Sequence, residues 1–409
     1  MEGRRHPLRM TTTSSEWLRP AAIAMSVDAV GVLPVFLTGA FALQLRVDVG
    51  LPVDALGLVY ASYFAAAALL SAPLSHVSGR TGPAWSLRIG CLVYIASFMG
   101  IATLGTSPVT LAVFVALAGV GTALTRTASS VFVVRNVESR RQGSAFGLKH
   151  CSIPVAALLA GLSVPTIALT VGWRWAFVAA ALLTVAVLLA IPATSDPPIP
   201  EPEVARPDMS LRLLIVAAVG FGLGSSAAAS LGAYTVSTAV AAGMDEGTAG
   251  ILVAVGSVCG LSSRLLIGRL SDRRKGSQLD LVSWMLTLGG VAYLMLGSVT
   301  EWVVLLAVPI AFATGWSWLG SYNLAMVRLN PLAPGLAVGI TQTGAFVGAI
   351  IGPASLGFLA QEHSFAAAWV GAAIASFAAA SIIFVLRRFM LGEPGRRELR
   401  RIEGSIAEV

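Results

Sequence analysis

The sequence carries very little charge for its length. Only 11% of its 409 residues are Asp, Glu, Lys or Arg, while 56% are hydrophobic. A soluble domain has about 25% charged residues on average, so this composition excludes a soluble globular protein. The chain also has only three cysteines, each within an apolar run. They have neither the number nor the spacing of a disulfide framework or a zinc site, and we expect no metal and no cofactor.

Long apolar runs recur along the whole chain, and each can cross a bilayer core of about 30 Å. Backbone in lipid must satisfy its own hydrogen bonds, so these runs should be helices. The short alternating segments of a membrane β-barrel are missing. The sequence therefore predicts an all-α polytopic membrane protein with twelve transmembrane helices, over 20–45, 55–78, 86–106, 109–134, 143–170, 173–192, 211–241, 249–270, 280–299, 302–327, 336–361 and 365–386.

The basic residues are divided unequally between the two sides of the predicted membrane. Of the 27 Lys and Arg, 22 fall in the terminal segments and in the loops on the same side as the termini. Only Arg46 and Arg174 fall on the opposite side. Because cytoplasmic loops carry an excess of Lys and Arg, both termini are predicted to be cytoplasmic. The net charge of +7 therefore indicates membrane orientation and not a nucleic-acid partner.

The two halves of the chain resemble each other at a nearly constant offset. Residues 145–161 align with 337–353 at an offset of 192, and 75–83 corresponds to 268–276 at an offset of 193. Two copies of six helices in the same orientation imply two bundles related by an axis along the membrane normal. The expected division is an N-terminal segment 1–19, a bundle 20–192, a proline-rich linker 193–210, a bundle 211–386 and a basic tail 387–409.

The stretch after the eighth predicted span, GRLSDRRKG, contains Gly268, Asp272 and Arg273. It resembles the G-x-L-x-D-R-x-G-R loop of the major facilitator superfamily, which recurs after the second and eighth spans. The resemblance implies a conformational latch, in which a carboxylate at a helix end meets an arginine or a helix N-terminus. In the first half, Gly79 stands where the family has Asp, while Arg80 remains.

This resemblance covers nearly the whole chain. It implies the family's fold of two six-helix bundles and secondary active transport by alternating access. Among relatives, the chain looks closest to bacterial organic-anion, monocarboxylate or cyanate-type permeases. The resemblance also implies a multi-pass monomer in a bacterial cytoplasmic (inner) membrane, with a small molecule, protons and the lipid bilayer as its partners. No Walker loop, zinc motif or Ser/His/Asp arrangement indicates an enzyme.

Away from the ends of the predicted spans, the charged side chains are Asp28, Arg126, Lys149 and Arg264. The first three lie roughly 12–14 Å inside the cytoplasmic boundary at about 1.5 Å per residue. A charge at mid-bilayer costs on the order of 3 kcal/mol, so such groups usually face a cavity or pair. We expect these three to converge on a pocket between the bundles. Arg264 lies roughly 7–8 Å deep and can either reach this pocket or snorkel to the interface.

Asp28 and Arg126 lie on spans that line the central cavity in the family this chain resembles. Asp28 is predicted to couple transport to protons, and the alternative is a fixed ion pair that holds two helices together. Arg126, Lys149 and Arg264 are predicted to bind substrate. Three cations and one anion leave an excess of two positive charges, which a bound organic anion would offset. His150 is a further candidate, with a packed helix residue as the alternative.

Four uncharged residues in predicted spans are weaker substrate-binding candidates. Trp316, Tyr322 and Asn323 lie in the tenth span, and Gln342 lies in the eleventh at the position equivalent to His150. They could stack on or hydrogen-bond an organic substrate, or simply pack the bundle. Trp316 and Trp318 are two positions apart and point to different helix faces, so at most one of them should face a cavity.

The sequence favours a proton-coupled transporter of a small organic anion, such as a monocarboxylate or a cyanate-like solute. The alternative is a proton-driven drug or multidrug efflux antiporter. That alternative fits less well, because a positive cavity disfavours cationic cargo and the family's G-P-x-x-G-G drug-antiporter signature is missing from the fifth span. A membrane enzyme or a sensor is disfavoured because no catalytic constellation appears.

Overall fold

The structure, a computed structural model, describes residues 17–193, 208–273, 278–330 and 332–391. Every regular element in these ranges is a helix, and twelve helical spans are long and apolar enough to cross a membrane. The predicted all-α architecture with twelve spans is therefore confirmed. The predicted linker and terminal segments lie largely outside the described residues, so the domain boundaries stay a prediction.

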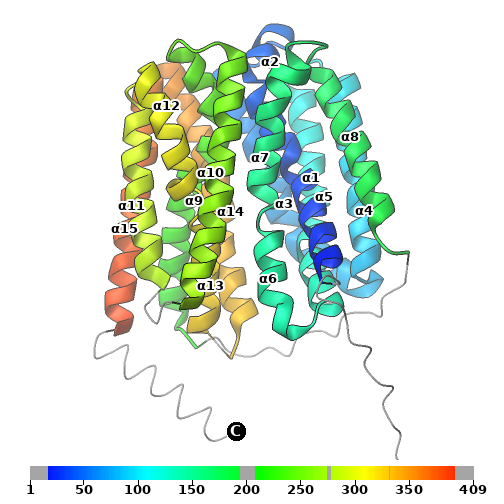
Figure 1. Ribbon diagram of the computed structural model, residues 1–409, viewed down its shortest axis with the longest axis vertical. Coiled ribbons are helices and arrows are strands. Elements are labelled where there is room, and N and C mark those ends of the chain that lie inside the picture. Colours follow the sequence, from blue (N-terminus) through cyan, green and yellow to red (C-terminus); the bar gives the residue numbers. More distant parts are fainter. Residues whose placement is uncertain (1–16, 194–207, 274–277, 331, 392–409) are drawn as a thin grey trace, which may run out of the picture.

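The helices form two bundles that stand side by side (Figure 1). The first bundle comprises α1 (Leu18–Ala40), α2 (Ala42–Asp48), α3 (Val53–Thr81), α4 (Pro83–Leu104), α5 (Pro108–Asn136), α6 (Ser139–Lys149), α7 (Ser152–Ser163), the π-helix η1 (Val164–Ala168) and α8 (Trp173–Ala190). The second comprises α9 (Leu211–Ala241), α10 (Glu246–Arg273), α11 (Gln278–Leu296), α12 (Glu301–Ile310), the π-helix η2 (Ala311–Gly315), α13 (Leu319–Leu329), α14 (Pro334–Glu362) and α15 (Phe365–Leu391). The start of α1 and the end of α15 lie at the same end of the molecule, here called the termini side, and the opposite end is the far side (Figure 1).

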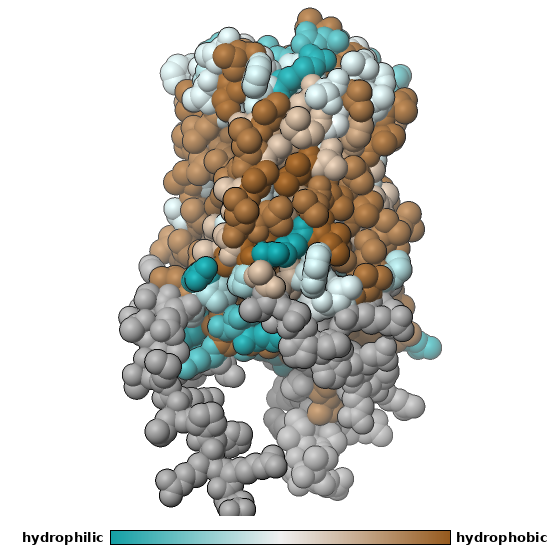
Figure 2. All heavy atoms as spheres, turned by 90° about the vertical axis from the view of Figure 1, so that its right-hand side faces the viewer, coloured by the Kyte–Doolittle hydropathy of each residue, from teal (hydrophilic) through white to brown (hydrophobic). Residues whose placement is uncertain are grey.

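The outer surface carries the apolar belt that a bilayer requires. Figure 2 shows this belt over the flank formed by α4 and α8, with hydrophilic residues bordering it at both ends. Large apolar side chains stand exposed there, among them Leu92 on α4 and Leu182 and Leu189 on α8. In water such a surface would be unfavourable, whereas lipid tails cover it without cost.

The two bundles follow one plan at a constant spacing in the chain. Helix α1 begins at Leu18 and α9 at Leu211, an offset of 193 residues. The fourth span runs over Pro108–Asn136 and the tenth over Glu301–Leu329, again 193 residues later at both ends. The repeat seen in the sequence is thus a repeat of helices, and equivalent positions can be compared directly.

The bundles meet mainly where α3 packs along α14 and α7 along α10. Near the far side, Gly161 of α7 and Gly250 of α10 bring two backbones together. A Cβ added to Gly161 would lie 2.6 Å from the Gly250 carbonyl oxygen, so only glycine permits this approach. Three hydrogen bonds also join the bundles there: Tyr60 Oη to Gly232 O (3.0 Å), Tyr234 Oη to Val53 O (3.0 Å) and Gln44 Nε2 to Glu246 Oε2 (2.7 Å).

Of the spans that the sequence predicts as continuous helices, the first is interrupted at Phe41 and two others are interrupted beside the space between the bundles. The fifth breaks at His150 and Cys151, between α6 and α7. Pro154 has no backbone N–H, so it cannot donate to the His150 carbonyl one turn before it. The tenth span passes through η2 and then a turn at Trp316 before α13 begins. In transporters, broken helices expose backbone groups beside a cavity. Both of these breaks border the cavity that is described in the next section.

Candidate functional site: a cavity between the bundles

A cavity lies between the two bundles. Six of the predicted site residues line it: Asp28, Arg126, Lys149, His150, Trp316 and Gln342. They come from α1, α5, the α6–α7 break, the turn after η2 and α14. The structure thus brings the three deepest ionisable groups of the sequence to one shared space, while their roles in transport stay predictions.

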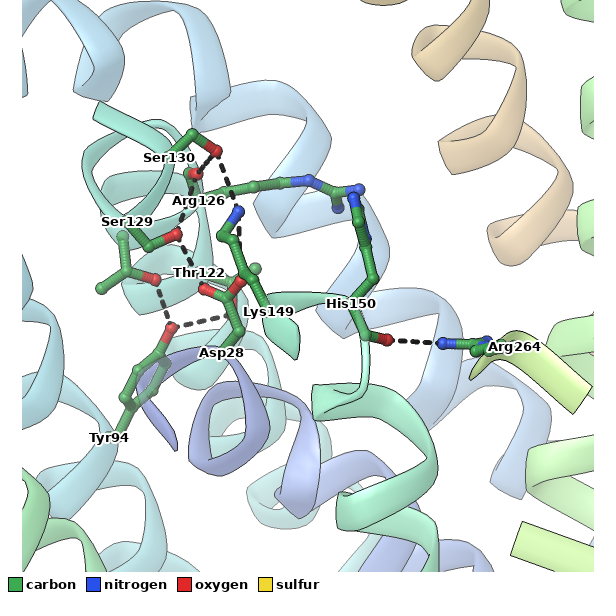
Figure 3. Close-up of polar contacts among 10 residues, drawn as sticks. Asp28, Tyr94, Thr122, Arg126, Ser129, Ser130, Lys149, His150 and Arg264 are labelled. Carbon is green, nitrogen blue, oxygen red and sulfur yellow. Dashed lines mark hydrogen bonds and ion pairs between the residues drawn. The ribbon is translucent and has the colours of Figure 1, made fainter. Parts of the chain in front are cut away.

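Asp28 forms an ion pair with Lys149 at the wall of this cavity (Figure 3). The distance from Lys149 Nζ to Asp28 Oδ2 is 3.3 Å, and the two side chains are only 7% and 19% exposed. Ser129 Oγ donates to Asp28 Oδ1 at 2.9 Å, and Lys149 Nζ donates to Ser130 Oγ at 2.8 Å. The carboxylate is therefore satisfied by Lys149 and Ser129, and Arg126 is not its ion-pair partner.

Arg126 points across to the other bundle. Its guanidinium carbon lies 5.0 Å from the centre of the Phe346 ring on α14. The residue is exposed to the cavity, and within the described part of the chain its guanidinium makes no hydrogen bond and no ion pair. In Figure 3 no dashed contact reaches this group. Arg126 is therefore a cation held in place over an aromatic face with its donors free.

A group of hydroxyls that sequence reasoning missed lies beside Asp28. Tyr94 Oη is 2.7 Å from Thr125 Oγ1 and 3.1 Å from Thr122 Oγ1, and Tyr63 Oη is 2.8 Å from Thr122 Oγ1. All four residues line the cavity. Tyrosines within otherwise apolar spans were the available signal, because a buried phenol needs a hydrogen-bond partner.

Arg264 joins the two interrupted helices across the bundle interface. Its Nη1 donates to the carbonyl of His150 at 2.7 Å, and its Nη2 donates to the carbonyl of Trp316 at 3.1 Å. The first of these is the carbonyl that Pro154 leaves without a helical donor. The described cavity lining does not include Arg264. The structure therefore places this guanidinium on backbone carbonyls and does not bring Arg264 to the other predicted substrate-binding cations, Arg126 and Lys149.

The tenth span divides its aromatic residues between two environments. Trp316 lines the cavity and packs against Phe36 of the other bundle, with ring centres 5.2 Å apart. Tyr322 lies in the core of the second bundle and donates to the Ala217 carbonyl at 2.7 Å. Asn323 is also outside the described lining of the cavity. The structure therefore does not bring Tyr322 and Asn323 to the site, whose described lining includes only the first residue of α13, Leu319.

The latch residues can be placed only by their backbone. Arg80 lies in the last turn of α3, and Gly268, Asp272 and Arg273 lie in the last turns of α10. Their side chains are outside the part of the structure that is described. The helices continue through what the sequence analysis expected to be the loop ends, and the latch stays a prediction.

The cavity between two six-helix bundles agrees with a match to known proteins. The family model described as Major Facilitator Superfamily matches residues 22–279 and 213–407. The chain belongs to the major facilitator superfamily. A solved structure of a bacterial homologue of the human lysosomal transporter Spinster, in an inward-facing and occupied conformation, is similar with a TM-score of 0.72. The similarity covers 92% of this chain and 98% of that chain at 12% identity, which shows the fold alone. No curated protein sequence matches.

Membership in the major facilitator superfamily makes this chain a multi-pass membrane protein and a secondary transporter of a small solute. In this architecture the substrate site lies between the two repeats, near the middle of the membrane. The cavity that contains Asp28, Arg126 and Lys149 is lined by residues of both repeats. The chemistry of its lining is therefore the best guide to the substrate.

Proposed function

We propose that this major facilitator protein transports an organic anion together with a proton. The observation that supports the proposal most strongly is Arg126, whose guanidinium is open to the cavity without an acceptor among the described residues. An uncompensated charge away from bulk water is unfavourable. A carboxylate removes this cost, since it can accept two parallel hydrogen bonds from one guanidinium.

The charges around the cavity also link the anion to a proton. With Lys149 paired to Asp28, Arg126 is the excess positive charge of the described lining. Protonation of Asp28 without an anion would raise that excess to two. An anion bound at the same time restores it to one, so each ligand favours the binding of the other. Loaded and empty cavities then carry the same net charge.

The ion pair supplies a mechanism for this coupling. A protonated Asp28 no longer holds the Lys149 ammonium, which could then turn toward the anion on Arg126. Ser130 already holds that ammonium at 2.8 Å on its other side. Besides Lys149, the described groups with an electrostatic interaction with Asp28 are Arg126 and the phenols of Tyr63 and Tyr94. The phenols are neutral at physiological pH. Asp28 is therefore the group we assign to proton binding, with Lys149 and Arg126 assigned to the anion.

One feature of the cavity supports the drug-antiporter alternative. Aromatic residues, among them Phe36, Tyr60 and Phe64, form part of its lining. Aromatic faces can hold lipophilic cations. The positive excess at Arg126 opposes such a cargo, so we place the anion carrier first.

The test is uptake into proteoliposomes under a pH gradient, with a panel of radiolabelled carboxylates and with the lipophilic cation tetraphenylphosphonium. We expect gradient-driven uptake of carboxylates above that of protein-free liposomes, and no such excess for the cation. Replacing Arg126 by Gln should weaken carboxylate binding by about 30-fold or more, since the charge-assisted pair is lost. Movement of the cation alone, with Arg126→Gln indifferent, would favour the antiporter instead.

We also propose that both termini face the cytoplasm in a bacterial inner membrane, and that the protein works as a monomer. The support is the excess of Lys and Arg on the termini side. A fluorescent protein fused to the C-terminus should fluoresce in cells if that end is cytoplasmic. A periplasmic reporter active at the same position would reverse the orientation.

A further inference from the structure

The two bundles contribute different chemistry to the cavity. Every charged residue of its described lining comes from the first bundle. The second bundle contributes mainly apolar surface, with Trp316, Leu319 and Phe346 as its largest side chains. A small hydrophilic anion such as cyanate would leave this apolar wall uncovered. The apolar wall therefore indicates a substrate that has an apolar part as well as a charge.

Two polar atoms interrupt this apolar wall, and neither has a hydrogen-bond partner. They are Ser225 Oγ on α9 and Gln342 Oε1 on α14, and both atoms are buried. Both residues line the cavity, and Ser225 is only 5% exposed. Buried polar atoms in proteins are almost always satisfied. A carbonyl oxygen such as Gln342 Oε1 can only accept a hydrogen bond, so the missing partner is a donor.

The spacing of these features limits the size of the ligand. Gln342 and Phe346 are four residues apart on continuous α14, so they face the same side about one helical turn, or about 5.4 Å, apart. The Arg126 guanidinium lies 5.0 Å from the Phe346 ring centre. Arg126 and Gln342 therefore both lie within about one helical turn of Phe346, so a ligand with a single ring is long enough to reach from one to the other.

We propose that the substrate is a ring-bearing carboxylate with a hydroxyl or similar donor at the opposite end. The carboxylate binds Arg126, the ring packs between Phe346 and Trp316, and the donor reaches Gln342 and Ser225. Phe346 and Gln342 are then the residues that determine specificity. This inference rests on the proposed function, because it needs an anion at Arg126, and it replaces the expected cyanate-like solute by a larger amphipathic acid.

The test measures dissociation constants of the purified full chain for acetate, benzoate, 4-hydroxybenzoate and neutral benzyl alcohol. We expect 4-hydroxybenzoate to bind about tenfold more tightly than benzoate, because it satisfies a buried acceptor. Benzoate should bind at least about tenfold more tightly than acetate, because its ring covers the apolar wall. Benzyl alcohol, which lacks the anion, should bind more weakly than benzoate.

Two variants separate the contributions of ring and donor. Phe346→Ala should bring the affinities for benzoate and acetate to within about threefold of each other, because the aromatic platform is lost. Gln342→Leu should remove the preference for 4-hydroxybenzoate over benzoate, so that the ratio of the two dissociation constants falls from about tenfold to about one. The retained ligand in each case shows that the variant is folded.

The outcomes distinguish this inference from the function on which it rests. Acetate binding as tightly as 4-hydroxybenzoate, or preferences unchanged in both variants, would overturn the ring-bearing substrate and leave an anion transporter standing. Binding of no carboxylate at all, while benzyl alcohol or tetraphenylphosphonium binds, would overturn the proposed function and this inference together.

Discussion

Lys149 of the first bundle and Thr341 of the second stand at equivalent positions, 192 residues apart in the chain. Both are buried, at 5% and 0% exposed. Lys149 forms an ion pair with Asp28, while the Thr341 hydroxyl donates back to the Ala337 carbonyl of its own helix. The same place in the repeat therefore holds a paired charge in one bundle and a locally satisfied hydroxyl in the other.

Pro154 and Phe346 are a second pair of equivalent positions, 192 residues apart, and they too have different roles in the two bundles. Pro154 follows the break between α6 and α7 and leaves the His150 carbonyl to Arg264. Phe346 lies within the continuous helix α14 and faces Arg126. The comparison teaches that duplication gives the two bundles one plan, whereas the site depends on where they differ. The first bundle supplies charge and a broken helix, and the second supplies a rigid apolar wall.

The largest effect should come from neutralising the carboxylate of the first bundle. In Asp28→Asn, the side chain can no longer exchange a proton, so a pH gradient should not drive accumulation. The accumulation ratio should fall from about tenfold per pH unit of gradient to no accumulation, measured as anion uptake into proteoliposomes. Thr341→Val is the matched control and should retain the gradient response. A pH-driven accumulation that survives in Asp28→Asn would contradict the assignment.

A second test places a lysine in the second bundle at the position equivalent to Lys149 of the first bundle. Thr341→Lys buries an ammonium at a site where the described surroundings include no carboxylate comparable to Asp28. We expect a loss of about 3 kcal/mol of stability, measured as reduced unfolding temperature and yield in detergent. Thr341→Val loses one weak hydrogen bond and should cost about 1 kcal/mol. Equal stability of the two variants would show that the position is not selective against charge.

The contact between the two bundles offers a third test. Gly161→Val puts a branched side chain against the Gly250 carbonyl, and such overpacking costs about 1–3 kcal/mol. We expect the far side to open and transport to slow. Ser237 of α9 lines a far-side pocket between the bundles together with Arg46 and Pro52, so opening is measured as faster labelling of a cysteine at Ser237 by an impermeant reagent. Gly339→Ala is the control, because nothing lies within 4 Å of its added Cβ. Unchanged labelling in Gly161→Val would mean that this contact does not hold the far side closed.

The smallest effect should come from removing the proline that distinguishes α7 from α14. In Pro154→Ala, a new backbone N–H can donate to the His150 carbonyl and compete with Arg264. Weakening one hydrogen bond by about 1 kcal/mol should change the transport rate about fivefold. Substrate affinity should stay the same, because neither group binds the anion. A change in affinity with no change in rate would contradict this account of Arg264.

The sequence was sufficient to predict the twelve spans and the meeting of Asp28, Arg126 and Lys149 at one cavity. Hydropathy determines the spans. A charged side chain within an apolar span is stable only where it faces a cavity or forms an ion pair. The ion-pair partner of Asp28 was not predictable, because it depends on helix rotation and on the break after Lys149. Phe346 was missed because an apolar residue in an apolar helix carries no signal of its own. Its alignment with Pro154 was the available clue.

Tyr322 and Asn323 lie outside the described cavity lining, although Leu319, about one turn earlier on α13, is part of it. Hydropathy does not report at which residue a helix leaves the wall of a cavity. Arg264 was misplaced for a related reason, since its acceptors are carbonyls that only an interrupted helix exposes. Pro154 was visible in the sequence, but its consequence for a residue on another helix was not.

The most direct test of the central claim, that anion and proton binding are linked through Asp28, is calorimetry of 4-hydroxybenzoate binding in buffers of different ionisation enthalpy. At a pH where Asp28 is ionised in the empty cavity, the wild-type protein should take up about one proton for each anion bound. Asp28→Asn should take up none while still binding the anion. Anion binding without proton uptake in the wild type, or equal uptake in both proteins, would contradict the account.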